Sequence, residues 1–298
     1  EIVAESRSRH ETFRVLVDAC TGEVLLRHCL THYLTDATYN VFTSESPSPF
    51  SPGNTNATMT NQPPIVARTL VTLSALDTNA SPAGWIPDGG NETWGNNVDA
   101  HTDRNANNVV DEPRPQGSPA RTFDCPIDLS QDPTNHAHAS VVQMFYWNNW
   151  IHDRLYQLGF TEAAGNFQSN NFARGGYEGD AVQADAQDGA TANYASFTTL
   201  TDGNAPRMQM HFFTVPTPRR DAGLDAEIVI HEYCHGLSSR RVGGGIGLST
   251  LQSLGLGEGW SDFYALALLS EPADDLAGNY AFGAYATYQY RTTSYRNN

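Results

Sequence analysis

The sequence contains no lysine, so arginine supplies all 17 of its basic residues, against 33 acidic ones. The formal net charge of -16 at pH 7 means that the field over most of the surface would repel phosphate groups. This charge argues against nucleic acid or an anionic membrane surface as the partner. The absence of lysine is interpreted as a bias of genome composition and supports no functional conclusion.

Long hydrophobic runs are also absent. No stretch approaches the ~18 consecutive apolar residues of a membrane-spanning helix, so membrane insertion is not expected. Cysteine is scarce, because Cys20, Cys29, Cys125 and Cys234 are too few and too scattered for a disulfide framework. Hydrophobic residues nevertheless make up 39% of the 298 positions, which is enough for a globular core.

The apolar pattern predicts a mixed α+β chain. Apolar residues on both sides of Thr21-Gly22 predict a β-hairpin, and residues 43–64, rich in Ser, Pro and Asn, predict a linker or surface loop. Spacings near 3.6 residues predict three helices, and the turn-rich region between the first and second of them is typical of strands. The predicted helices span residues 137–158, 225–239 and 257–270.

The second predicted helix carries His231-Glu232-Tyr233-Cys234-His235. Residues four apart lie on one helix face, so His231 and His235 can bind the same tetrahedral zinc ion. Zinc lowers the pKa of a bound water, and Glu232 is placed to take its proton and pass it to the leaving nitrogen of a peptide. The alternative is a structural helix with two histidines that bond to other groups.

The third predicted helix carries two carboxylates, Glu258 and Asp262, which are also four residues apart. A catalytic zinc takes three protein ligands, and its histidines usually donate their second N–H to a carboxylate. Glu258 is therefore the predicted third ligand, and Asp262 is predicted to support His231. Taken alone, such a pair is more often solvated helix surface.

These motifs resemble the fungalysin family of extracellular zinc metallopeptidases, which belong to the thermolysin-like gluzincins. The resemblance is carried by FYWNNWIHDRLYQLGFTEAAGNFQ at 145–168, NNFARGGYEGDAVQADAQDG at 170–189, HEYCHGLSSR at 231–240 and GEGWSDF at 257–263. It implies a two-lobed zincin that binds one zinc ion per chain. It also implies a secreted monomer that hydrolyses internal peptide bonds of proteins or peptides.

The same resemblance implies roles for individual residues and segments. His231, His235 and Glu258 are the implied zinc ligands, with Glu232 as the catalytic acid and base. Residues 1–36, which include VDACTGEVL at 17–25, are similar to the end of an inhibitory propeptide, which makes the propeptide an expected partner of the enzyme. Residues 37–298 would then form the catalytic domain, with its C-terminal helical lobe incomplete and an oxyanion-stabilising histidine expected beyond Asn298.

One departure from the family pattern concerns substrate binding. Asn193-Tyr194-Ala195 stands where the family tends to have Asn-Asn-Ala before an edge strand that aligns the substrate. Asn193 and Ala195 are therefore expected to bind the substrate, while Tyr194 puts recognition of its backbone in doubt. Cys234, inside the histidine motif, is interpreted as a packing residue that faces away from the metal.

A second cation site is a weaker prediction. Asp103, Asn105, Asn107 and Asp111 place oxygen atoms at alternating positions, as calcium-binding loops do. The segment lacks glycine at its sixth position and glutamate at its twelfth, so a turn rich in Asp and Asn is the favoured alternative. For the whole chain, the alternative to an enzyme is a latent module that binds zinc without catalysing hydrolysis, and a serine or cysteine hydrolase is a distant third.

Overall fold

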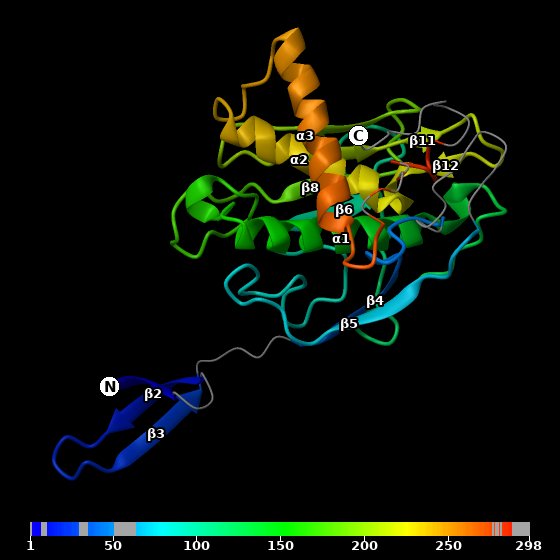
Figure 1. The fold of residues 1–298 in the computed structure, drawn as a ribbon. Coiled ribbons are helices and arrows are strands. Elements are labelled where there is room, and N and C mark those ends of the chain that lie inside the picture. The colour runs from blue at the N-terminus through cyan, green and yellow to red at the C-terminus, as the bar shows by residue number, and fades with distance from the viewer. Residues whose placement is uncertain are drawn as a thin grey trace. The chain divides into compact units, whose positions relative to one another are not determined.

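A computed structural model describes residues 2–6, 11–29, 35–50, 64–275, 277, 280 and 282–287 (Figure 1). The chain divides into two units, Glu1–Thr35 and Asp36–Asn298. Within the described residues the structure is mixed α/β, with three α-helices and several small sheets. None of the described helices is long and apolar enough to span a lipid bilayer.

The first unit is a three-stranded antiparallel sheet in the order β1-β2-β3. β2 and β3 form a hairpin, in which the carboxylate of Asp18 accepts hydrogen bonds from the backbone N–H groups of Cys20 and Thr21. Gly22 completes the turn at φ 73°, a conformation that glycine adopts without strain. The strands are β1 (Ile2–Ser6), β2 (Glu11–Val17) and β3 (Val24–Cys29).

The second unit is built on a four-stranded sheet in the order β6-β8-β10-β9. β8 pairs in parallel with both β6 and β10, whereas β9 pairs antiparallel with β10 and forms an edge of the sheet. The side chains of Met208 and Met210, in strand β10, are fully buried. The strands are β6 (Val98–Thr102), β8 (Val182–Ala186), β9 (Ala195–Thr198) and β10 (Arg207–Met210).

Smaller elements complete the second unit. β4 pairs antiparallel with β5 and in parallel with β7, and β11 pairs antiparallel with β12. The bounds of these strands are β4 (Ala37–Val41), β5 (Thr69–Leu73), β7 (Thr122–Phe123), β11 (Phe212–Phe213) and β12 (Arg220–Asp221). Short 3₁₀ turns lie at Pro133–His136, Glu162–Ala164 and Ala222–Leu224.

Helix α1 (Ala137–Gln157) is the central element of this unit and matches the helix predicted at 137–158. Its apolar side chains, including Phe145, Trp147 and Ile151, are fully buried, and it packs against β4, β6 and β8. Unlike an amphipathic surface helix, it also buries polar residues such as Asn149 and His152. These polar side chains need partners inside the protein.

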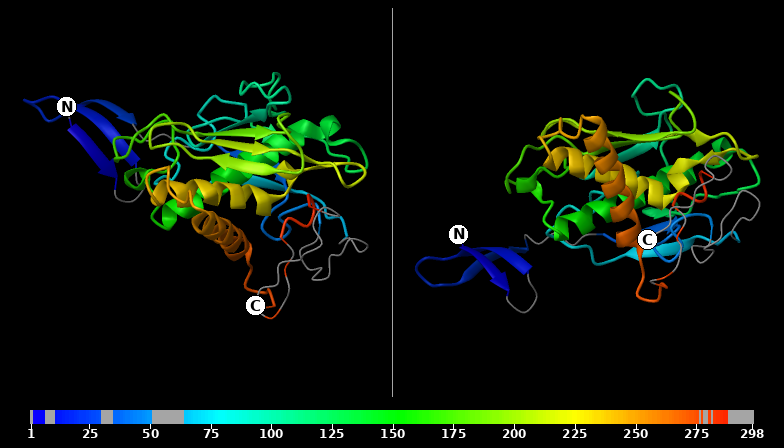
Figure 2. Two further views of the ribbon diagram at one scale, coloured as in Figure 1. Left: turned by 90° about the horizontal axis from the view of Figure 1, so that it is seen from above. Right: turned by 45° about the horizontal axis from the view of Figure 1, so that its top comes forward.

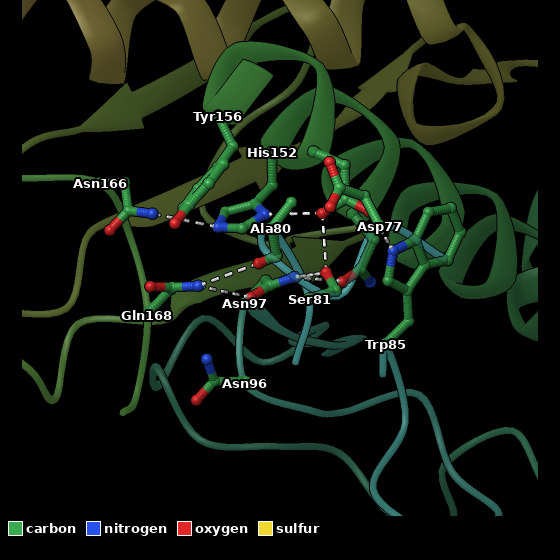
Figure 3. A network of polar contacts seen from close by, with 12 residues as sticks. Asp77, Ala80, Ser81, Trp85, Asn96, Asn97, His152, Tyr156, Asn166 and Gln168 are labelled. Carbon is green, nitrogen blue, oxygen red and sulfur yellow. Dashed lines mark hydrogen bonds and ion pairs between the residues drawn. The ribbon is translucent and has the colours of Figure 1, made fainter. Parts of the chain in front are cut away.

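The partners are supplied by a buried network at the C-terminal half of α1 (Figure 3). The carboxylate of Asp153 accepts hydrogen bonds from the Ser81 hydroxyl at 2.7 Å and the Trp85 indole N–H at 2.8 Å. His152 lies 2.9 Å from the same carboxylate and 3.3 Å from the Asn166 amide. The network therefore ties two long loops to α1.

Helices α2 (Ala226–Arg241) and α3 (Leu251–Leu269) cross one another, and the four-stranded sheet lies over α1 and α2 (Figures 1 and 2). The prediction that the third helix begins near Gly257 was wrong. The helix starts at Leu251, because Thr250 and Ser253 form a reciprocal capping box at its N-terminus. Packing on α2 sustains the helix through the glycines that had suggested a later start.

A buried chain of charges joins β6 to β8. His101, whose side chain is 1% exposed, lies 3.1 Å from Asp99 and 3.0 Å from Asp185. Arg114 pairs with Asp99 and Arg207 pairs with Asp185, so each carboxylate also faces a permanent cation. Burial opposes the charged imidazolium, but the hydrogen bonds to both carboxylates outweigh it and raise the pKa of His101 to about 9.

His101 should therefore make stability depend on pH. Its folded pKa lies above the unfolded value near 6.5, so its contribution is complete below pH ~6.5 and is lost as the pH rises through about 9. We expect the free energy of unfolding to fall by about 2–3 kcal/mol over this window. Urea unfolding at pH 6 and pH 10 tests this, with His101→Gln as the comparison. An equal change in the wild type and the variant would contradict the assignment.

Candidate metal centre

Helix α2 brings two histidines to one point on its surface. His231 and His235 lie one turn apart, with their Nε2 atoms 3.0 Å from each other and their rings nearly perpendicular at 81°. Both nitrogens therefore point toward the same small volume. This is the arrangement expected of residues four apart on a helix.

Helix α3 adds a carboxylate to this point. Glu258 Oε2 lies 3.3 Å from His231 Nε2 and 3.5 Å from His235 Nε2. Ligands about 2.0–2.1 Å from a tetrahedral zinc ion are separated from each other by about 3.3–3.5 Å. The three atoms thus approximate one face of a zinc tetrahedron, and the fourth corner would be open to water or substrate.

Asp262 contacts the first of these histidines. Its Oδ1 lies 2.7 Å from His231 Nδ1, on the opposite edge of the ring from the shared point. A carboxylate at Nδ1 fixes the proton there and leaves Nε2 free to bind a metal ion. The structure therefore places Asp262 beside the ligand that the four-residue spacing of α3 suggested it would support.

The close approach of α2 and α3 depends on small side chains. The buried positions of α3 are Gly257, Ser261, Ala265 and Leu269, which recur every four residues. A Cβ added at Gly257 would lie 3.8 Å from His235 Nδ1, so α3 packs directly on the ligand-bearing turn of α2. Larger side chains along this seam would push Glu258 away from the histidines.

Charge at the centre favours a bound cation. Burial opposes protonation of His231, but hydrogen bonds to Asp262 and Glu258 raise its pKa to about 9. Hydrogen bonds from His231 and His235 hold the pKa of Glu258 well below its usual range. Burial raises the pKa of Glu232, which is 6% exposed and lies within the field of both histidines. The centre therefore attracts positive charge, whether that charge is a proton or a metal ion.

The edge strand β9 passes over the same helix. A Cβ at Gly236 would lie 2.5 Å from the ring of Phe197, so only glycine permits this contact one residue beyond His235. Ala195 begins β9 and pairs with Met210. The side-chain amide of Asn193 donates a hydrogen bond to Thr214, and Asn193 is not one of the residues grouped at the candidate metal site. The exposed ring of Tyr194 stacks on His211.

The residues of the predicted calcium loop are only partly brought together. Asp103 accepts the backbone N–H groups of Asn107 and Asn108, and Asp111 accepts the N–H of Arg104 and the amide of Asn105. These are the contacts of a turn rich in Asp and Asn. The Asp103 carboxylate instead groups with the buried carboxylates of Asp185 and Asp188, which come from a distant part of the chain.

Sequence reasoning missed a group of residues beside His231. The ring of Phe282 packs on the His231 ring, with 5.4 Å between their centroids. Glu227 and Asp225, at the start of α2, accept the backbone N–H groups of Gly283 and Ala286. The sequence does show Asp225 and Glu227 as two acidic residues about one turn before His231, whereas nothing in it pointed to Phe282.

Comparison with known proteins identifies the family of the chain. The family model described as Fungalysin metallopeptidase (M36) matches residues 54–298. An extracellular metalloproteinase of Leptosphaeria maculans is 40% identical over 278 residues, which cover 90% of this chain and 41% of the relative. One of Pyrenophora tritici-repentis is 42% identical, covering 87% of this chain and 38% of the relative. Extracellular metalloproteinase 3 of Trichophyton soudanense is 44% identical, covering 70% of this chain and 55% of the relative. The chain spans about two fifths of the length of the first two relatives.

Replacing Asp262 should weaken metal binding without removing a ligand. In Asp262→Ala, His231 loses the group that fixes its Nδ1 proton and ring orientation, so we expect zinc affinity to fall about 10- to 100-fold. Asp262→Asn, which keeps the shape of the side chain, should lose less. Competition with a chromogenic chelator measures both affinities. Unchanged affinity in Asp262→Ala would show that the contact does not support the ligand.

Proposed function

This chain belongs to the fungalysin metallopeptidase family, and on that premise we propose that it is the zinc-binding part of a secreted endopeptidase. The observation that carries the proposal is the triangle of His231 Nε2, His235 Nε2 and Glu258 Oε2, with sides of 3.0, 3.3 and 3.5 Å. Zinc is the metal that best fits two imidazoles, one carboxylate and an open fourth position. Secretion is supported by the relatives named as extracellular metalloproteinases.

The proposed chemistry is hydrolysis of internal peptide bonds. His231, His235 and Glu258 would hold a zinc ion, which would supply a water of lowered pKa and a Lewis acid for the peptide carbonyl. Glu232 takes the proton of the attacking water and then delivers it to the leaving nitrogen, so it acts first as base and then as acid. Its buried position, which raises its pKa, suits both proton transfers.

Substrate binding is proposed along β9. The outer side of this edge strand offers unpaired backbone groups to an extended peptide, and β9 lies against the helix that carries the histidines. Ala195 is part of this edge, while Asn193 would act through its backbone carbonyl, because its side chain bonds to Thr214 and its N–H donates to the Phe212 carbonyl. Proteins and peptides are accordingly the proposed substrates of a monomeric enzyme.

The proposal extends to the arrangement of the longer protein. Residues 1–36 are proposed to be the end of an inhibitory propeptide, and residues 37–298 to be catalytic domain whose second, helical lobe completes a two-lobed zincin. The division of the chain at Thr35 and Asp36 is compatible with that boundary. A latent form that binds zinc without hydrolysing peptides is the competing possibility, and activity separates the two.

Glu232→Gln is the decisive variant for the mechanism. We expect it to lower peptide hydrolysis by at least ~10²- to 10⁴-fold, because the proton acceptor is lost, while one zinc ion per chain is retained. Cleavage of denatured casein and metal content by atomic absorption are the measurements, with chelator-treated and zinc-restored wild type as controls. Cleavage that survives in the variant would refute the role of Glu232. Zinc-independent cleavage by the wild type, or none at all, would refute the enzyme proposal for this chain.

A further inference from the structure

The segment 282–287 follows α3 in the chain and returns to the beginning of α2, beside the metal centre. Its first residue, Phe282, is half-buried and contacts the ring of His231 at an angle of 52° and 5.4 Å between centroids. Aromatic rings at this separation attract each other and limit each other's rotation. His231 is thus held at its Nδ1 edge by Asp262 and on one face by Phe282.

Two carboxyl groups, one buried and one half-buried, hold this segment in place. Glu227 accepts the N–H of Gly283 at 2.6 Å, and Asp225 accepts the N–H of Ala286 at 3.3 Å. Gly283 also packs on Ile228, since a Cβ there would lie 3.4 Å from that side chain. Both hydrogen bonds join the segment to the first turn of α2, one turn before His231.

The outer end of the segment is anchored separately. The carbonyl of Tyr285 accepts a hydrogen bond from Arg220 at 2.7 Å, and the Tyr285 ring packs edge-on against Phe50 at 5.4 Å. These contacts are fully or largely buried. Phe282 is therefore fixed by the tethers behind it, which makes its contact with His231 a defined one.

We propose that Phe282 is a positioning residue that fixes the ring plane of His231 for metal binding, and that Glu227 acts through Phe282 by tethering the segment. The inference rests on the proposed zinc site, whose ligands it leaves unchanged. Without Phe282, the imidazole keeps its hydrogen bond to Asp262 but gains freedom to rotate about that bond. Metal affinity then falls, because binding must fix a ring orientation that the free variant no longer holds.

A matched control is available at Glu227. Burial and the neighbouring Asp225 raise the pKa of Glu227 well above its usual range, which favours the neutral acid. Glutamine has the same shape and also offers one acceptor oxygen. Glu227→Gln should therefore keep the tether, whereas Glu227→Leu should remove it.

The test compares zinc affinity and the visible absorption spectrum of the Co²⁺-substituted full chain. We expect Phe282→Ala to lower zinc affinity about tenfold and to alter the Co²⁺ spectrum, while Phe282→Tyr preserves both. Glu227→Leu should resemble Phe282→Ala, and Glu227→Gln should resemble the wild type. In the double variant, Glu227→Leu should add little to Phe282→Ala, because both changes act on one contact.

Controls separate this inference from the function on which it rests. Phe172→Ala, at a half-buried ring that contacts Arg174, should leave zinc affinity unchanged, and His231→Ala should abolish tight binding. Thermal unfolding of the metal-free proteins identifies any variant that fails to fold, and Phe282→Leu then replaces it. A wild-type affinity and spectrum in Phe282→Ala would overturn the inference while leaving the zinc site intact. Failure of the wild type to bind zinc would overturn both.

Discussion

The close packing of α2 against α3 is the constraint on which the metal centre depends. Glu258 lies within 3.5 Å of both histidines on a helix whose buried residues Gly257, Ser261 and Ala265 are all small. That composition has a cost, since each glycine inside a helix disfavours it by about 1 kcal/mol relative to alanine. Gly255 and Gly259 have open space around them, so α3 relies on the Thr250 cap and on packing with α2 to remain helical.

The charges around the two histidines also favour a bound cation. Carboxyl groups from α2 and α3 lie around the two histidines of α2, and among the described residues no arginine forms an ion pair with Glu258 or Asp262. Asp225 and Glu227 add two more carboxyl groups one turn earlier, but burial raises the pKa of both and so disfavours their charged forms. The negative charge beside the histidines therefore comes mainly from Glu258, whose pKa is held well below its usual range.

The sequence predicted the parts of this centre that follow from local periodicity. A four-residue spacing defines a helix face, so the positions of His231, His235, Glu258 and Asp262 along the chain were enough to predict that they share one site. Helix α1 was predicted within one residue of its end, because Gly159 follows its C-cap, Leu158. The start of α3 was misplaced, since helix propensity counts glycines but does not include the packing surface that tolerates them.

Contacts between distant segments could not be predicted at all. The partners of Asp103 come from β8 and the loop beyond it, and Phe282 meets His231 only because the chain turns back after α3.

Because the chain turns back after α3, the proposed metal centre is connected to residues well beyond its proposed ligands. Glu258, the proposed third ligand, lies on α3, and the chain after α3 then supplies Phe282 and the backbone groups that bond to Glu227 and Asp225. A cation bound between the helices would hold α3 to α2 at one end, while these two carboxyl groups hold the following segment to α2 at the other. Because a ligand that binds only the folded state stabilises it by mass action, we expect metal binding to stabilise this arrangement of α2, α3 and the 282–287 segment. The acidic residues that begin α2 are thus part of the machinery that keeps His231 in place, although they touch neither the metal site nor its other ligands.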